Sequence, residues 1–168
     1  MVPSAYVHIP FCDSICAYCD FVRIQKNEQF FSSWKEKLIQ EIQEYKISNL
    51  HTLYFGGGTP SVLSLDDFAS IRNGFPSSID EFTVECNPES LDEDKLNAYV
   101  ALGVNRISLG VQSFKDDLLK ICHRTHTASQ AISVIENIKK SSISTFSIDL
   151  IFGLPNQTME DVKKDIST

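Results

Sequence analysis

The 168-residue sequence has no run of about 18 apolar residues, the length that a membrane-spanning helix requires. Its first residues lack the basic and apolar segments of a secretory signal peptide. It also has no internal repeat, no low-complexity tract and no linker rich in proline or glycine. A formal net charge of −7 is a poor match for nucleic-acid phosphates. These absences favour a cytoplasmic protein with no membrane span and no nucleic-acid partner.

The composition is that of an ordinary folded domain. Hydrophobic residues make up 42% of the chain and charged residues 22%, which is enough apolar surface for a core. A chain of this length is one domain or part of a larger one. We therefore treat residues 1–168 as a single unit.

Cysteine is the residue with the most unusual distribution. The chain has five cysteines, and three of them, Cys12, Cys16 and Cys19, lie within eight residues. An odd number in so tight a group is a poor layout for disulfides but suits a metal ion or a cluster. Cys86 and Cys122 stand alone, and we expect them to be small packed side chains.

Five short runs rich in β-branched and aromatic residues predict strands, at residues 5–9, 52–55, 81–85, 105–111 and 145–152. Helical patterns lie between them. One is the apolar stripe over residues 31–45, another covers residues 130–140, and three open with the capping patterns Ser64–Asp67, Ser90–Glu93 and Thr158–Asp161.

The alternation of strand and helix predicts a parallel sheet with right-handed crossovers, either a barrel or a doubly wound sheet. Five βα units cannot close an eight-stranded barrel. The sequence also stops inside the pattern of the fifth helix. We therefore expect a chain that is truncated before a sixth βα unit and lacks a C-terminal domain.

Each predicted strand ends in residues that a plain loop does not need. The carboxyl ends of parallel strands meet at one edge, where such folds place their chemistry. We therefore expect one site there, built from the cysteine loop, the glycine run 56–58 with Thr59 and Pro60, Glu85, Gln112 and Asp149.

The spacing Cys12-x3-Cys16-x2-Cys19 offers three thiolates on one short loop. A four-iron cluster normally takes four cysteines, so three would leave one iron open for another ligand. A zinc site is an alternative, but it would need a fourth ligand, and His8 is the nearest candidate. Free thiols are the remaining possibility.

The other residues of this edge carry weaker signals. The glycine run lets backbone approach a ligand closely or makes a tight turn closed by Pro60. Glu85 suits a surface carboxylate or an acceptor for ribose hydroxyls. Asp149 stands in an apolar run, where burial requires a partner or a ligand. His123 and His126, which flank Arg124, are expected in a solvated loop.

Six segments in order resemble the radical S-adenosylmethionine (SAM) superfamily. Within it they resemble the oxygen-independent coproporphyrinogen III oxidase family and its heme-chaperone branch. The similarity extends from about Tyr6 to Pro155. It is carried by YVHIPFC…CAYCDF, YFGGGTPS, VECNPES, RISLGVQSF, HRTH and DLIFGLP.

The resemblance implies a partial (β/α) barrel whose cofactors are a [4Fe–4S] cluster and SAM, with reductive cleavage of SAM as the reaction if the chain is active. Cys12, Cys16 and Cys19 would hold the cluster. Heme, a heme-accepting protein and an electron donor are further implied partners. The SAM pocket would be formed by Tyr6, Tyr18, Gly57, Gly58, Thr59, Glu85, Gln112, Arg124 and Asp149.

One position departs from the oxidase pattern. The oxidases have a fourth cysteine two residues after the third, where this chain has Phe21. The resemblance therefore favours a heme chaperone over a coproporphyrinogen oxidase. A degenerate, non-catalytic remnant that folds around zinc or nothing is a third hypothesis.

Overall fold

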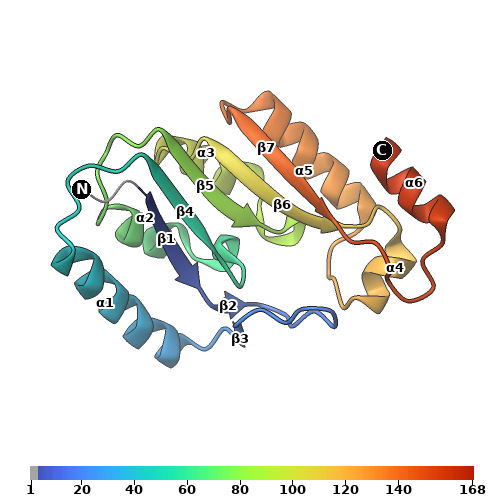
Figure 1. Cartoon of the computed structure of the whole chain (residues 1–168), viewed down its shortest axis with the longest axis horizontal. Coiled ribbons are helices and arrows are strands. Elements are labelled where there is room, and N and C mark those ends of the chain that lie inside the picture. The colour runs from blue at the N-terminus through green and yellow to red at the C-terminus, as the bar shows by residue number, and fades with distance from the viewer. Residues whose placement is uncertain (1–3) are drawn as a thin grey trace.

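The computed structural model describes residues 4–168. Its centre is a five-stranded parallel sheet in the order β1-β4-β5-β6-β7 (Figure 1). All five predicted strands are confirmed, with ends that differ by two residues or fewer. They are β1 Ser4–Ile9, β4 Thr52–Gly57, β5 Glu81–Cys86, β6 Arg106–Gln112 and β7 Thr145–Leu150. A small second sheet, not predicted, pairs β2 (Phe11–Cys12) with β3 (Ile24–Gln25).

Helices connect the strands, so the α/β class and the partial (β/α) barrel are confirmed. The short helix α4, which lies between β6 and the longer helix α5, was not predicted. The helices are α1 Glu28–Glu44, α2 Leu65–Arg72, α3 Glu93–Ala101, α4 Asp116–Ile121, α5 Ala128–Lys140 and α6 Met159–Ser167. Two single 3₁₀ turns, η1 Pro60–Val62 and η2 Pro88–Ser90, follow β4 and β5.

The predicted helix starts are right in two of three cases. Ser64 and Thr158 cap α2 and α6, and each side chain accepts a backbone N–H three residues later. The predicted start at Ser90 is wrong, because Asp92 caps α3 by accepting from the Lys95 N–H. Ser90 belongs to η2, where its hydroxyl donates to the Asn87 carbonyl instead.

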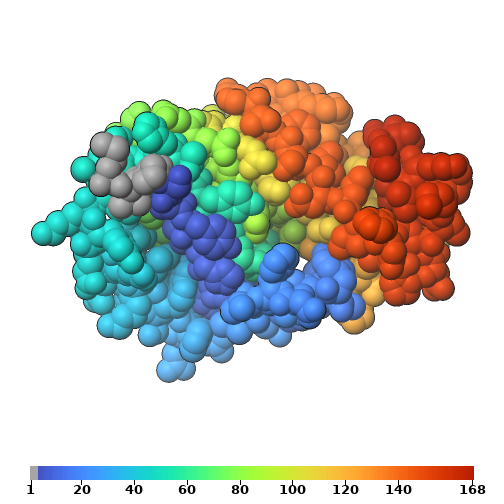
Figure 2. All heavy atoms as spheres, in the orientation of Figure 1, coloured from blue at the N-terminus to red at the C-terminus, as the bar shows by residue number. Residues whose placement is uncertain are grey.

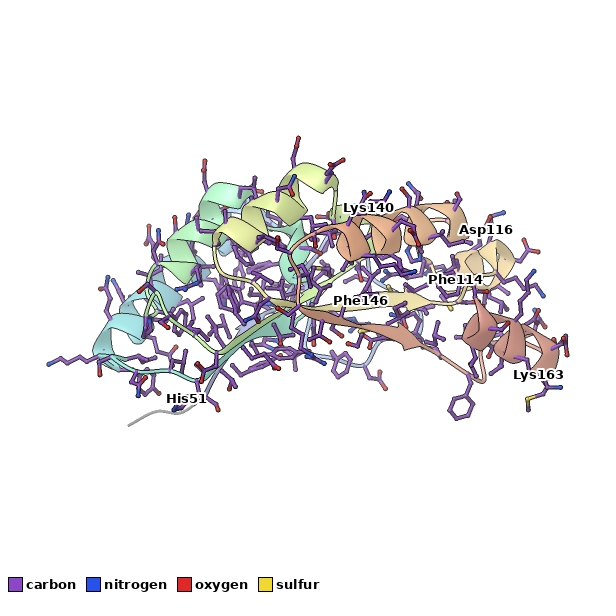
Figure 3. All side chains as sticks on the ribbon, turned by 90° about the horizontal axis from the view of Figure 1, so that it is seen from above. His51, Phe114, Asp116, Lys140, Phe146 and Lys163 are labelled. Atoms are coloured by element: carbon purple, nitrogen blue, oxygen red, sulfur yellow. The ribbon has the colours of Figure 1, made fainter. Side chains whose placement is uncertain are left out.

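One face of the sheet is covered by helices and forms the core (Figure 3). Along β6, Ile107, Leu109 and Val111 point into this core and are completely buried. The residues between them, such as Arg106 and Ser108, point to the opposite face because side chains alternate along a strand. The core also contains aromatic rings from several elements, among them Phe55 of β4, Phe82 of β5 and Tyr99 of α3.

No helix within the described part of the chain covers the opposite face of the sheet, which faces the viewer in Figures 1 and 2. The segment between β2 and β3, drawn in blue, lies below the carboxyl ends of β5, β6 and β7 in these views. The residues predicted for a site are found on this uncovered face and at the strand ends beside it. Within residues 4–168, no helix has the length and apolar content to cross a bilayer.

Candidate functional site

The carboxyl ends of the central strands and the cysteine loop enclose a cavity of about 530 Å³. Sequence analysis predicted twelve site residues, and all but Tyr6 line this cavity. They are Cys12, Cys16, Cys19, Tyr18, Gly57, Gly58, Thr59, Glu85, Gln112, Arg124 and Asp149. The structure thus gathers in one place residues that are up to 137 positions apart in the chain (12 to 149).

The cysteine loop is held in place by backbone hydrogen bonds along its length. The Ile24 and Lys26 N–H groups donate to the Pro10 and Cys12 carbonyls at 2.7 and 2.9 Å, which forms the small β2–β3 sheet. In the middle of the loop, the Ala17 N–H donates to the Cys122 carbonyl at 3.2 Å. The loop therefore has a defined path with its three cysteines on the cavity wall.

The three cysteines differ in exposure. Cys12 is 8% exposed, whereas Cys16 and Cys19 are partly exposed. Burial raises the pKa of the Cys12 thiol, and a hydrogen bond from Thr59 Oγ1 to its sulfur, at 3.5 Å, partly opposes this shift. The remaining cysteines, Cys86 and Cys122, are buried as expected.

The glycine run is required by close contacts within the protein itself. A Cβ on Gly58 would lie 2.7 Å from the Phe11 carbonyl oxygen and the Pro10 carbonyl carbon. Gly57 has a φ of +116°, and a Cβ there would lie 2.6 Å from the His8 ring. The run thus lets the end of β4 pack against the start of the cysteine loop, which positions one wall of the cavity.

Glu85 is held at the end of β5 by two neighbours. Its Oε1 accepts from the Tyr54 hydroxyl at 2.7 Å, and its Oε2 accepts from the Gly57 N–H at 3.0 Å. Burial, together with this hydrogen bond, raises the pKa of Tyr54, so the hydroxyl remains a donor. The carboxylate is therefore oriented at the cavity wall before any ligand binds.

Asp149 is exposed, so the apolar run in which it stands does not bury it. Phe146 and Ile148 of β7 pack against the core, while Asp149 points to the uncovered face. There its Oδ2 accepts from the Ser108 hydroxyl at 3.1 Å. Gln112 ends β6 at a bulge with a φ of +70°. Such a conformation is uncommon outside glycine and turns the chain toward the cavity.

Arg124 lies behind Cys16, and its Nη1 is 3.5 Å from the Cys16 sulfur. Its Nη2 donates to the Gly110 carbonyl at 2.9 Å and lies 3.3 Å from Glu89 Oε2. His126, whose Nδ1 is 3.0 Å from the same oxygen, is only 3% exposed. The prediction of a solvated loop is therefore wrong for His126 and right only for His123, which is exposed.

Glu89 was not predicted as a site residue. Its pKa is lowered: burial raises it, but the hydrogen bond from His126 and the charge of Arg124 lower it by more. The sequence gives no local signal for this cluster because Glu89 follows β5 while its partners follow α4. Their contact depends on the order of strands in the sheet.

Two aromatic residues complete the comparison with the prediction. Tyr18 lies in the cysteine loop beside Cys16 and lines the cavity. Tyr6 lies outside the cavity lining, in a separate groove between β1 and α1. Its ring stacks on Tyr54 with a centroid distance of 5.7 Å. It is therefore one side chain removed from the cavity, and its role in ligand binding stays a prediction.

Several other lining residues were missed, among them Tyr54, Asn87 and Ser108. Tyr54 and Ser108 orient Glu85 and Asp149, and the Asn87 side-chain amide donates to Thr59 Oγ1 at 3.2 Å. Tyr54 could have been found from the alternation of its strand, since it lies two residues before Gly56 of the predicted glycine run.

The donor set fits a cluster better than a single metal ion. Among residues 4–168, no three His, Cys, Asp or Glu side chains converge as one ion would require. His8, the fourth ligand considered for zinc, directs Nε2 to the Val22 carbonyl at 2.9 Å, and its Nδ1 lies 3.3 Å from the Tyr6 hydroxyl. In a cluster each thiolate binds a different iron, so three sulfurs spread over one wall are suitable.

The fold places the chain in the class of α/β proteins with a partial parallel (β/α) barrel. A family model described as the Radical SAM superfamily matches residues 6–168. The chain therefore belongs to the radical SAM superfamily, as the sequence motifs indicated. This family implies a [4Fe–4S] cluster and SAM as cofactors.

The curated relatives are longer proteins. The chain is 45% identical over 168 residues to "Heme chaperone HemW" of Lactococcus lactis subsp. lactis (strain IL1403), covering 97% of this chain and 44% of that protein. It is 37% identical to the protein of the same name from Bacillus subtilis (strain 168), covering 98% and 46%. It is 35% identical to "Anaerobilin synthase" of Escherichia coli O157:H7, covering 96% and 39%. The chain thus spans less than half the length of these relatives.

A solved structure has the same fold over nearly the whole of this chain. Coproporphyrinogen III oxidase (HemN) from Escherichia coli, described as a radical SAM enzyme, superposes with a TM-score of 0.86 at 28% identity. The match covers 99% of this chain and 40% of that one. The archaeal Elp3 of Methanocaldococcus infernus, at 18% identity and a TM-score of 0.64, shares the fold.

Proposed function

We propose that this chain binds a [4Fe–4S] cluster through Cys12, Cys16 and Cys19, binds SAM in the adjoining cavity, and acts in a heme chaperone. The observation that carries the proposal is the convergence of residues from all three cysteine positions and four strand ends on one cavity. Family membership supports the two cofactors, and the names of the most similar relatives support the link with heme.

The three cysteines suit the cluster because they line the same cavity and come from one loop. That loop has no fourth cysteine, so one iron of the cluster would remain without a thiolate ligand. Cys86 also lines the cavity, but it is only 2% exposed at the end of β5 and does not belong to the cysteine loop. When bound, the cluster would supply an electron for reductive cleavage of SAM, and its open iron would be the point of attachment. The protein orients the cofactors and excludes water.

The polar residues of the cavity match the chemical groups of SAM. Glu85 and Asp149 present carboxylate oxygens, which are suitable acceptors for ribose hydroxyls and an amino group. Arg124 presents a guanidinium, the usual partner of a carboxylate. Its Nε is buried without a hydrogen-bond partner among the described residues, as expected if a ligand or an ordered solvent molecule completes the site.

Phe21 separates the two heme-related hypotheses. It lines the cavity and is 73% exposed at the position where the oxidases carry a further cysteine. A phenyl ring offers neither a thiol nor a proton to a substrate, but it offers an apolar surface to a porphyrin plane. We therefore favour the chaperone over an oxidase, although the similarity to HemN keeps the oxidase as the alternative.

Anaerobic reconstitution tests the proposal. The purified chain is supplied with iron and sulfide, and iron content, absorbance and SAM cleavage under reduction are measured. We expect one four-iron cluster per chain in the wild type and none in Cys16→Ala, because two thiolates cannot hold the cluster stably. Cys122→Ala is the matched control, since this buried thiol lies outside the cavity lining, and it is expected to load normally.

The heme step is tested separately on the loaded chain. Heme binding is followed by absorbance, and oxidation of coproporphyrinogen is assayed in parallel. Heme binding without oxidation supports the chaperone, whereas oxidation supports the alternative. A wild-type chain that takes up no iron, or that holds one tetrahedral zinc, would overturn the proposal.

A further inference from the structure

Three polar side chains, those of Glu89, Arg124 and His126, form a largely buried cluster beside Cys16. Arg124 and His126 belong to the segment between α4 and α5, and Glu89 belongs to η2. The side chains of Arg124 and His126 are 4% and 0% exposed, and that of Glu89 is 21% exposed. Such a cluster is costly to bury unless its charges are paired and its donors satisfied.

Contacts at both ring nitrogens hold His126 in place. Its Nδ1 lies 3.0 Å from Glu89 Oε2, and its Nε2 lies 3.2 Å from the Val111 carbonyl oxygen. The ring is therefore fixed between η2 and the end of β6.

Glu89 also makes the neighbouring contact possible. Arg124 Nη2 lies 3.4 Å from His126 Nδ1. A single carboxylate oxygen contacts both, at 3.3 and 3.0 Å. That oxygen fixes the guanidinium and the ring relative to each other, and without it Arg124 would lose its present orientation.

The orientation of Arg124 matters because of where its other nitrogen lies. Its Nη2 is fixed by Glu89 and by the Gly110 carbonyl, at 3.3 and 2.9 Å. Its Nη1 is thereby placed 3.5 Å from the Cys16 sulfur, on the cavity wall. Any rotation of the guanidinium would remove this contact.

We propose that Glu89 and His126 are positioning residues that hold the Arg124 guanidinium against the Cys16 sulfur and the cavity. This inference rests on the proposed function, in which Cys16 binds the cluster and Arg124 contacts SAM. Hydrogen bonds to cluster sulfurs raise the reduction potential, because they stabilise the additional negative charge of the reduced state. Glu89 and His126 therefore set both the potential of the cluster and the affinity for SAM.

The test compares Glu89→Gln and His126→Asn with two matched controls. Glu93→Gln changes an exposed glutamate four residues from Glu89, and His123→Asn changes the exposed histidine of the same loop. In the reconstituted chain, both positioning variants are expected to bind SAM about tenfold more weakly. Their clusters are also expected to have a more negative midpoint potential and a shifted EPR signal, while both controls match the wild type.

A double variant shows whether Glu89 acts through Arg124. If it does, Glu89→Gln changes neither the potential nor the SAM affinity once Arg124→Gln is present. Effects that add fully would show independent roles and overturn the inference. Unchanged values in both Glu89→Gln and His126→Asn would overturn it as well.

A measurement on the chain without cofactors separates this inference from the proposed function. The ¹⁵N relaxation of Arg124 Nε, assigned from the signal lost in Arg124→Gln, reports the mobility of the guanidinium. We expect it to be rigid in the wild type and mobile in Glu89→Gln. Rigidity in both would refute the positioning role even if the cluster forms. Mobility in the variant would support it even if the wild-type chain takes up no iron.

Discussion

The two faces of the sheet carry very different side chains on the same strands. The covered face consists of apolar residues packed against the helices, and many of them are fully buried. The uncovered face carries hydroxyls, carboxylates and a guanidinium, linked by hydrogen bonds between neighbouring strands. Under the proposed function, stability and ligand binding therefore depend on alternate residues, so that a change at one position affects stability and a change at the next affects binding.

The register of the strands makes this separation possible. Ser108 of β6 pairs with Glu85 of β5 on one side and Ser147 of β7 on the other. The residue before it, Ile107, pairs with Val84 and Phe146, which belong to the core. Because the strands are in register, each face keeps its character across the sheet.

The largest expected effect comes from the covered face. Ile107→Ala removes a completely buried side chain from the core and is expected to lower the free energy of unfolding by about 2–5 kcal/mol. Ser108→Ala, one residue later, removes a hydroxyl that donates to Asp149 and is expected to cost about 1 kcal/mol. Urea denaturation of both variants measures the difference. Equal losses would contradict the separation of the two faces.

A smaller effect is expected from the uncovered face, and on binding instead of stability. Glu85→Gln keeps the size of the side chain and an acceptor oxygen but removes the charge. We expect SAM affinity to fall about tenfold, the loss typical of one charge-assisted hydrogen bond, or about 1.4 kcal/mol. The melting temperature should change little. Calorimetric titration of the reconstituted chain measures the affinity, and Glu81→Gln, at the opposite end of β5, is the control.

Sequence patterns predicted the elements that local chemistry determines. The alternating runs located all five strands, and the cysteine spacing and glycine run located the edge of the sheet where the cavity lies. The prediction failed where the deciding contact is distant in sequence. His126 was expected in a solvated loop, yet it is buried, and its ring nitrogens contact Glu89 and the Val111 carbonyl.

The helix α4 was missed because of its short length, not because of a distant contact. At six residues it is too short to show a repeating apolar stripe, although Leu118 and Leu119 are both buried. The glycine run was recognised, but its partner was not. The backbone that requires Gly58 to lack a side chain is that of Pro10 and Phe11, which only the pairing of β1 with β4 brings near.

The smallest expected effect concerns α6, where polar contacts hold a helix at the end of the sheet. Asp161 accepts from Lys115 Nζ at 2.8 Å and caps the helix by accepting from Thr158. The hydrogen bond from Lys115, followed by those from Thr158, lowers the pKa of Asp161 to about 2 from the ordinary 3.8. A carboxyl group whose pKa is lowered by folding stabilises the native state above its unfolded pKa. That contribution is lost as the pH falls from about 3.8 to about 2.

Asp161→Asn should therefore lower the melting temperature modestly at pH 6 and by progressively less as the pH falls, until the two proteins melt together near pH 2. Thermal unfolding followed by circular dichroism across this range measures the effect. Glu160→Gln, at the adjacent exposed position of α6, is the control, and its melting temperature should not converge with that of the wild type in this way.

A difference in melting temperature between Asp161→Asn and the wild type that stays constant down to pH 2 would show that the variant acts through helix propensity alone. In that case the charged contact with Lys115 would contribute nothing at this end of the sheet, and the attachment of α6 would depend on its other polar anchor, the buried Asp165, which accepts from Ser113 and the Phe114 N–H.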